Sequence, residues 1–268
     1  MDTNERRLAV LYHVLNEGFA EVSELARLFK CHVNSIRRDI ENLEHRGDLI
    51  RLLSPDLAVS IVATFPSEIL ARRLETHSSE KWEVAKKALE FVEDGDSIFL
   101  SGGATNFLVA LQIARSGKKG ISVLAGTLYI QHFLRGIDRS SILGGRISRH
   151  AAVVESSADI DTLKQYHINK AFLGVDGLGW DIGAFCAKTN VTLQHSACMA
   201  ASDLILFLTD DSEIGRVLPE GKFISFDELE EKSCNYKVVC NRVTEGGAKG
   251  ARTELELARF SEGRVIWA

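Results

Sequence analysis

The sequence predicts an α/β protein in which a small unit of three helices and a β-hairpin precedes a larger unit built on a mostly parallel sheet. Two observations predict this class. Residues 5–62 hold three short segments with apolar residues at steps of three and four, followed by two apolar runs around Ser54-Pro55-Asp56. From residue 81 onward, short apolar runs alternate with helical segments, and several of the runs end in glycine.

The composition is that of an ordinary soluble protein, with 268 residues, 45% hydrophobic residues and a formal net charge of -5. No apolar run is long enough to cross a bilayer, and the N-terminus lacks a secretory pattern, so we expect a cytoplasmic protein with no membrane partner. The five cysteines are scattered and form no C-x-x-C pair. We therefore expect reduced thiols, no metal and no cofactor.

Two helices are expected at the start of the chain. In the first, residues 5–17, the spacing of Leu8, Leu11, Tyr12 and Leu15 predicts the buried face, and Gly18 ends the helix. A short second helix is expected to begin at Ser23 as its N-cap and to run to about Lys30.

A third helix follows "CHVNS" and ends at Gly47. Its predicted buried stripe is Val33, Ile36, Ile40 and Leu43. Turn residues at 54–56 then predict a hairpin of strands 48–53 and 57–62. Three helices and a trailing hairpin indicate a winged helix-turn-helix over residues 1–62.

The outer face of the third helix carries short polar side chains and two arginines. If the apolar stripe faces the core, the residues that face away from it are Asn34, Ser35, Arg37, Arg38 and Glu41. A helix that enters the major groove of DNA needs this arrangement. The alternative is an amphipathic helix with a solvated charged face. Because the three helices, the tight turn and the hairpin occur together, we favour DNA binding despite the acidic net charge.

The rest of the chain is expected to form a linker helix, residues 63–80, and a second domain, residues 81–268. Glycines and polar residues follow its predicted strands, at Ser101-Gly102-Gly103, Ala125-Gly126-Thr127, Gly144-Gly145, Asp176-Gly177 and Asp210-Asp211-Ser212. In parallel sheets ligands bind at the carboxyl ends of the strands, so we expect the binding site there. The glycine-rich stretch 245–253 is expected to be a loop.

The stretch "VSELARLFKCHVNSIRRDIENLEHRGDLIR" resembles the helix-turn-helix of DeoR/GlpR-type bacterial transcriptional regulators. The matches include Arg37, Arg38, Asp39 and Arg51, whereas "LLSPDLA" replaces the family's usual wing turn. The resemblance covers about residues 5–240. It implies that the second domain is effector-sensing, with a fold similar to ribose-5-phosphate isomerase and glucosamine-phosphate deaminase.

The resemblance also implies partners and a function. It implies a sequence-specific repressor of a carbohydrate catabolic operon, relieved by a small sugar-derived ligand. The partners would be double-stranded operator DNA, that effector and further copies of the chain in a dimer or tetramer. The expected DNA-binding residues are Ser23, Asn34, Ser35, Arg37, Arg38 and Arg51.

The expected effector site centres on "SGGATN", where backbone N–H groups open a helix. The candidate residues are Ser101, Gly102, Gly103, Ala104, Thr105, Asn106, Gly126, Thr127, Gly145, Arg146, Asp176, Gly177 and Lys188. The Glu and Lys that the family places on a later helix fall at Thr192 and Ser196, and its other lysine becomes Glu213. We therefore expect a ligand other than a simple phosphosugar.

An enzyme of the isomerase or deaminase type with an added DNA-binding domain is the alternative function. Such an enzyme needs a general base and a lysine that grips phosphate, and no paired acid and base are visible at these positions. We therefore expect no catalytic residues. Trp180 could stack on a sugar ring or pack in the core, and the sequence leaves both roles open.

Overall fold

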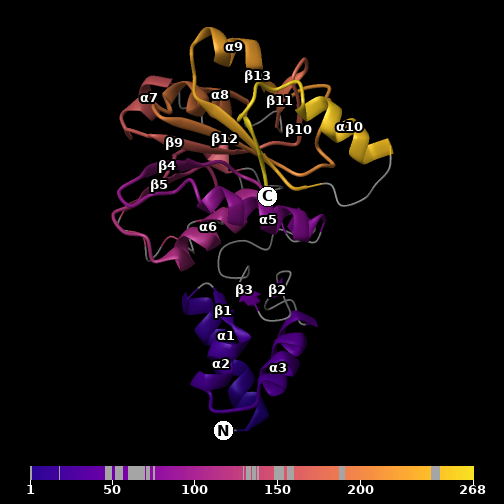
Figure 1. The fold of residues 1–268 in the computed structure, drawn as a ribbon. Helices are drawn as coiled ribbons and strands as arrows, with labels where there is room; N and C mark the ends of the chain where they lie inside the picture. The colour runs from indigo at the N-terminus through magenta and orange to yellow at the C-terminus, as the bar shows by residue number, and fades with distance from the viewer. Residues whose placement is uncertain are drawn as a thin grey trace. The chain divides into compact units, whose positions relative to one another are not determined.

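The computed structural model describes residues 2–17, 19–45, 50–51, 57–59, 70, 73–74, 76–128, 130, 134, 137, 139–147, 154–155, 160–186, 191–242 and 248–268. The chain divides into two compact units, Met1–Ser78 and Ser79–Ala268, which are described separately (Figure 1). None of the helices in these ranges is long and apolar enough to span a membrane.

Up to residue 59, the described part of the first unit holds three helices and a small antiparallel sheet. The helices are α1 (Thr3–Glu17), α2 (Val22–Leu28) and α3 (Val33–His45). The strands β1 (Phe19–Glu21), β2 (Ile50–Arg51) and β3 (Leu57–Val59) pair in the order β1-β3-β2. This arrangement confirms the predicted winged helix-turn-helix, and it adds the strand β1 that the sequence did not indicate.

The buried face of α1 differs from the predicted one. Leu8 and Tyr12 are 53% and 58% exposed, whereas Val10 and Val14 are buried against α2 and α3. The reason is that α1 carries two apolar stripes, so periodicity alone does not choose between them. Ile36, Ile40 and Leu43 of α3 are buried as predicted, whereas Val33 is only partly buried. The side chain of Leu15 lies outside the described residues.

The start of α2 also differs from the prediction. The N-cap is Glu21, without a side-chain hydrogen bond, and Ser23 is an exposed residue inside the helix. Because β1 runs directly into α2 and Val22 is buried in the core, packing rather than a serine cap sets the helix start. Lys30 takes a left-handed conformation, φ 49°, in the tight turn that leads to α3.

The second unit is built on a seven-stranded sheet in which all paired strands are parallel. Its order is β15-β14-β12-β9-β4-β5-β6. The bounds are β4 (Ser97–Leu100), β5 (Ser122–Ala125), β6 (Arg139–Ile142), β9 (Lys170–Gly174), β12 (Leu204–Thr209), β14 (Tyr236–Cys240) and β15 (Val265–Trp267). This confirms the predicted sheet. The chain proceeds outward in opposite directions from the neighbouring strands β4 and β9.

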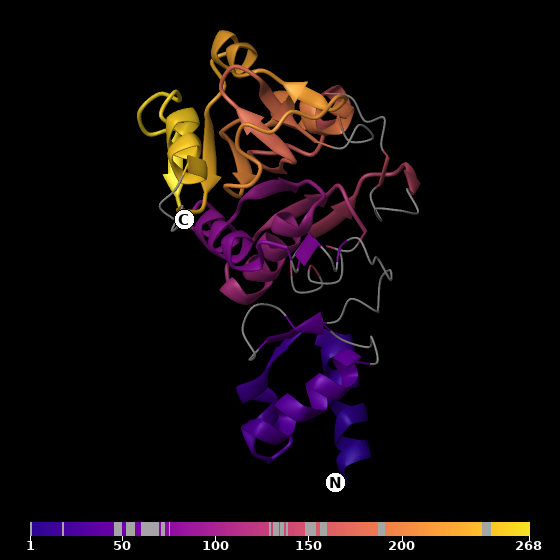
Figure 2. The same cartoon turned by 90° about the vertical axis from the view of Figure 1, so that its right-hand side faces the viewer.

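Helices cover both faces of this sheet (Figures 1 and 2). The helices α5 (Ser78–Leu89) and α6 (Ala104–Ser116) lie on one face, and α7 (Ile160–Lys164), α8 (Val191–Ala200) and α9 (Phe226–Glu231) lie on the other. The helix α10 (Ala248–Leu257) occupies most of the stretch expected to be a loop. That prediction was wrong because Thr253 and Leu257 of α10 are buried. Their packing outweighs the low helix propensity of the glycines in this stretch.

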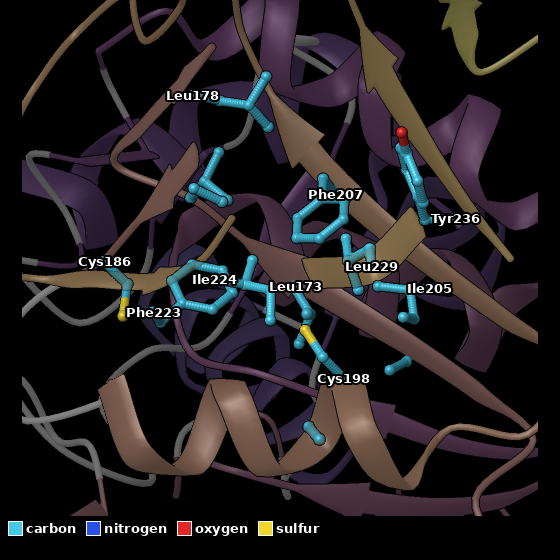
Figure 3. Packing of buried hydrophobic residues seen from close by; sticks show 14 of the residues in the cluster. Leu173, Leu178, Cys186, Cys198, Ile205, Phe207, Phe223, Ile224, Leu229 and Tyr236 are labelled. Atoms are coloured by element: carbon cyan, nitrogen blue, oxygen red, sulfur yellow. The ribbon is translucent and has the colours of Figure 1, made fainter. Parts of the chain in front are cut away.

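One hydrophobic core lies between the sheet and the α8 side (Figure 3). Leu173, Ile205, Phe207 and Tyr236 from the strands pack there with Cys198 from α8. A small antiparallel sheet covers this layer, formed by β10 (Gly177–Gly179), β11 (Gly183–Phe185) and β13 (Lys222–Ile224). A further pair is β7 (Arg146–Ile147) with β8 (Val154–Glu155). One of the helical segments expected after residue 81, residues 127–136, falls largely outside the described residues.

Candidate DNA-binding and effector sites

The outward face of α3 carries the predicted DNA-contacting side chains. Asn34 and Arg38 are exposed, and Ser35 and Arg37 are half-buried. Arg37 Nη1 donates to Asn34 Oδ1 at 3.4 Å, so these two polar groups lie on the same side of the helix. Because the opposite side is buried in the core of the unit, this face points to solvent. It is available to a nucleic acid.

The other two predicted residues lie on neighbouring elements. Ser23 is exposed on α2, and Arg51 lies in β2. One residue of the same motif behaves differently from its neighbours. Asp39, directly after Arg37 and Arg38, is 1% exposed and faces α1. Sequence reasoning placed Asp39 neither in the buried stripe nor among the outward-facing residues.

The carboxyl ends of β4 and β9 meet where the chain changes direction. After β4, the turn Ser101-Gly102-Gly103 leads into α6, with Gly103 at the N-cap and φ +110°, a conformation that favours glycine. Ala104, Thr105 and Asn106 form the first turn of α6 and are buried. In open parallel sheets this switch point is where ligands bind.

Polar side chains from three elements converge on the end of β9. Ser101 Oγ accepts a hydrogen bond from Gly174 N at 3.0 Å, and the Asn106 amide lies 3.0 Å from the same oxygen. From α8, Gln194 Nε2 donates to Gly174 O at 3.3 Å. Gln194 is 2% exposed, and its Oε1 is buried with no hydrogen-bond partner among the residues that the structure describes. A buried acceptor of this kind needs a donor, such as a water molecule or a ligand hydroxyl.

The loop after β12 is acidic. Glu213 Oε2 accepts hydrogen bonds from Thr209 Oγ1 and from Asp210 N, both at 3.1 Å. The pKa of Glu213 is raised to about 8, first by burial and next by the neighbouring Asp210 carboxylate. Lys81 of α5 forms an ion pair with Asp210. The position where the family carries lysine therefore holds a carboxyl group next to a second one.

The remaining predicted residues lie at the same edge of the sheet. Gly126 and Thr127 follow β5 and are buried, Gly145 follows β6 and is exposed, and Arg146 belongs to β7. Asp176, half-buried, follows β9, and Gly177 begins β10. Lys188 lies outside the described residues. The topology thus brings the described candidates to one edge, and it adds Lys81 and Gln194, which carried no sequence motif.

Trp180, whose role the sequence left open, packs against other aromatic rings, and His195 contacts a neighbouring helix. The ring of Trp180 stacks on Phe226, with centroids 5.9 Å apart, and meets Phe260 edge-on at 5.3 Å. Trp180 is therefore a packing residue. His195 Nε2 lies 3.1 Å from Glu228 Oε1, an ion-pair distance between α8 and α9.

Comparison with known proteins places both units. Residues 6–54 match the model of the DeoR-like helix-turn-helix domain, and residues 76–242 match that of the DeoR C terminal sensor domain. The chain is 25% identical over 87% of its length to an uncharacterized HTH-type transcriptional regulator, FruR, of Bacillus subtilis (strain 168), covering 97% of that protein. It is 24% identical to a putative aga operon transcriptional repressor of Escherichia coli O157:H7, covering 80% of each chain.

A further relative is the glycerol-3-phosphate regulon repressor of Escherichia coli (strain K12), 22% identical over 81% of this chain and 84% of that one. Among solved structures, ribose 5-phosphate isomerase from Plasmodium falciparum is similar at 20% identity and a TM-score of 0.37, covering 51% of this chain and 52% of that one. The relatives are named as transcriptional regulators and repressors. The sensor-domain model alone spans more than half of the sequence, and the chain belongs to the DeoR family of transcriptional regulators.

Proposed function

We propose that this protein is a sequence-specific repressor of a carbohydrate-related operon, released from its operator by a small sugar-derived effector. Residues 1–62 bind DNA, residues 81–268 sense the effector, and residues 63–80 link the two domains. The protein acts in the cytoplasm as a homo-oligomer, because helix-turn-helix proteins usually read symmetric operators with two copies of the motif. The repressor names of the two Escherichia coli relatives support this assignment.

The solvent-facing polar side of α3 is the observation that carries the DNA-binding part. Asn34 and Arg38 project from a helix whose other side is fixed by Ile36, Ile40 and Leu43. Asn and Arg are the side chains that pair bidentately with adenine and guanine edges in the major groove. Ser23, Ser35 and Arg51 are the proposed supporting contacts, made to the phosphate backbone.

Fluorescence anisotropy with the full chain tests this part. The probe is the duplex that the wild-type protein enriches from a random-sequence pool, and a scrambled duplex of the same composition is the reference. We expect Arg37→Ala and Arg38→Ala each to weaken binding to the enriched duplex about tenfold, or about 1.4 kcal/mol. Lys164→Ala, an exposed position on α7, is the control. Unchanged binding by both arginine variants contradicts the assignment of α3 as the reading helix.

The acidic loop after β12 carries the effector part. A phosphate group at this edge would meet Asp210 and Glu213 instead of the lysine that the family resemblance implies. Neither carboxyl group supplies the positive charge that complements a phosphate, so the effector is a sugar derivative that is less anionic than a phosphosugar. The helix N-terminus at Gly103 and Gln194 Oε1, which has no partner within the described ranges, suit hydroxyl groups, because a hydroxyl both accepts and donates hydrogen bonds.

A thermal-shift screen of the full chain tests the effector class. The probes are free hexoses, amino sugars, sugar acids and hexose phosphates at equal concentration. We expect stabilisation by members of the first two classes, and none by hexose phosphates. The variant Glu213→Lys restores the family residue and is expected to gain a response to hexose phosphates. Strong stabilisation of the wild-type chain by phosphates alone would contradict the proposed class.

A further inference from the structure

Asp39 is a buried acid in the middle of the proposed DNA-reading helix. Both oxygens of its carboxylate accept hydrogen bonds from arginines of α1. Arg6 Nε donates to Oδ2 at 2.6 Å, and Arg7 Nε donates to Oδ1 at 3.2 Å. The side chain of Asp39 is 1% exposed, and those of Arg6 and Arg7 are 16% and 28% exposed. Two guanidinium groups of one helix therefore hold one carboxylate of another.

This contact is directional, unlike the apolar contacts that the structure describes between α1 and α3. The apolar contacts of Ile36, Ile40 and Leu43 contribute stability with little angular preference. Charge-assisted hydrogen bonds to both carboxylate oxygens restrict how far α3 turns about its own axis. The hydrogen bond with Asp39 also raises the pKa of Arg6, as expected for a close ion pair.

We propose that Asp39 is a positioning residue for operator recognition, which fixes the rotation of α3 through Arg6 and Arg7. Successive side chains on a helix point about 100° apart, so the direction of Asp39 sets the direction of Arg38. A small rotation of α3 moves Arg38 and Asn34 away from the base edges but leaves the charge of the unit near DNA. This inference rests on the proposed DNA-binding function and deepens it.

The test compares Asp39→Asn with Glu41→Gln in the full chain. Both substitutions remove one negative charge from α3, but Glu41 is exposed, so only the first removes the link to α1. The measured quantity is the ratio of affinities for the enriched duplex and for the scrambled duplex at one salt concentration. Partial unfolding lowers both affinities by the same factor, so the ratio reports positioning and not stability.

We expect Asp39→Asn to lower this ratio about tenfold, with binding to the scrambled duplex unchanged or stronger, because Arg6 and Arg7 lose their counter-ion. Glu41→Gln is expected to keep the wild-type ratio. If Asp39→Asn does not fold, as circular dichroism would reveal, Arg7→Gln removes only the longer bond and is expected to lower the ratio in the same direction.

A wild-type ratio in the folded Asp39→Asn protein, or in Arg7→Gln where Asp39→Asn is unfolded, overturns the positioning role. An equal drop for Glu41→Gln overturns it as well, because charge alone would then explain the effect. A wild-type protein that enriches no duplex and does not discriminate between the two probes has a different meaning. That result overturns the proposed function itself, and the role of Asp39 with it.

Discussion

Lys81 on α5 and Asp210 at the end of β12 form an ion pair, with Nζ and Oδ2 3.1 Å apart. Both residues are buried, at 8% and 1% exposed. Asp210 Oδ1 accepts hydrogen bonds from the backbone N–H and hydroxyl of Ser212. Oδ2 has no hydrogen-bond partner among the described residues, so the ion pair with Lys81 compensates for the loss of hydration of this buried oxygen. The first helix of the second unit is thereby joined to the proposed effector edge.

Lys81→Met is expected to lower the free energy of unfolding by about 3 kcal/mol, because it leaves a buried carboxylate without its cation. Urea unfolding of the full chain, followed by circular dichroism, measures this. The matched control is Lys86→Met on the same helix, where the side chain is 65% exposed. The control is expected to change stability by less than about 0.5 kcal/mol. If the two substitutions lower the free energy of unfolding equally, the buried ion pair contributes no more to stability than an exposed lysine does.

The pKa of Glu213 predicts a pH dependence of stability. Because burial raises this pKa to about 8 from 4.5, the folded state holds a proton that the unfolded state releases between these values. Stability therefore falls as pH rises from about 4.5 to about 8 and is constant above that window.

Glu213→Gln removes this titration. We expect the variant to be more stable than the wild type at pH 8.5 by about 1–2 kcal/mol, and to differ little from it at pH 5. Thermal unfolding at both pH values measures the effect, and Glu220→Gln, an exposed position, is the control. A pH profile that is the same for Glu213→Gln and the wild type would show that the carboxyl group titrates normally.

Local sequence patterns predicted the architecture well where a pattern was compatible with only one buried face or one type of element. The stripe of Ile36, Ile40 and Leu43 correctly predicted the buried side of α3. The apolar runs that end in glycine correctly predicted the alternation of strands and helices in the second unit. The predicted face of α1 failed, because its valines and its larger apolar residues form two competing stripes. Only the three-dimensional packing of α2 and α3 selects the valines.

The candidate effector site was predicted in its backbone but not in its side chains. Glycines and acids after strands predicted the edge, since parallel strands bring their carboxyl ends together. Lys81 and Gln194 come from α5 and α8, at positions 129 and 20 residues away from their partners Asp210 and Gly174. No local spacing encodes such contacts. The burial of Asp39 was likewise not predicted, because a charged residue beside two arginines ordinarily faces solvent.

A second buried cation, Lys170, lies at the opposite edge of the same sheet. Its Nζ is 2.8 Å from Asp96 Oδ2 and 3.0 Å from Glu93 Oε2. Burial alone lowers the pKa of Lys170, but the hydrogen bonds with Asp96 and Glu93 outweigh it and raise the pKa above 10.5. The stabilisation is therefore fully present below pH 10.5 and is lost as pH rises through the folded-state pKa.

Lys170→Met is expected to destabilise the chain by about 3 kcal/mol at pH 7 and by less above pH 11, where the wild type begins to lose the same ion pair. Because this edge is opposite the effector edge, the remaining folded protein is expected to keep the wild-type thermal shift with an effector sugar. Urea unfolding and thermal shift check the two parts. A lost effector response would show that this edge also contributes to the site.

Gly177 brings two segments of the proposed effector edge into close approach. A Cβ at this position would lie 2.3 Å from the backbone oxygen of Arg216, too close for any side chain. The two segments also pair through Leu178 N, which donates to Glu213 O at 3.1 Å. Gly177→Ala therefore separates the loop that holds Asp176 from the loop that holds Glu213.

We expect Gly177→Ala to lower the free energy of unfolding by about 2 kcal/mol, because backbone must move to relieve the overlap. The effector response is expected to fall further than stability explains, since both loops border the proposed site. Gly144→Ala is the matched control at the same edge, where an added Cβ meets nothing within 4 Å. Chemical denaturation gives the stability term, and effector titration at a temperature where both variants are folded gives the binding term. A Gly177→Ala protein that is destabilised but binds the effector with wild-type affinity would place the effector away from these two loops.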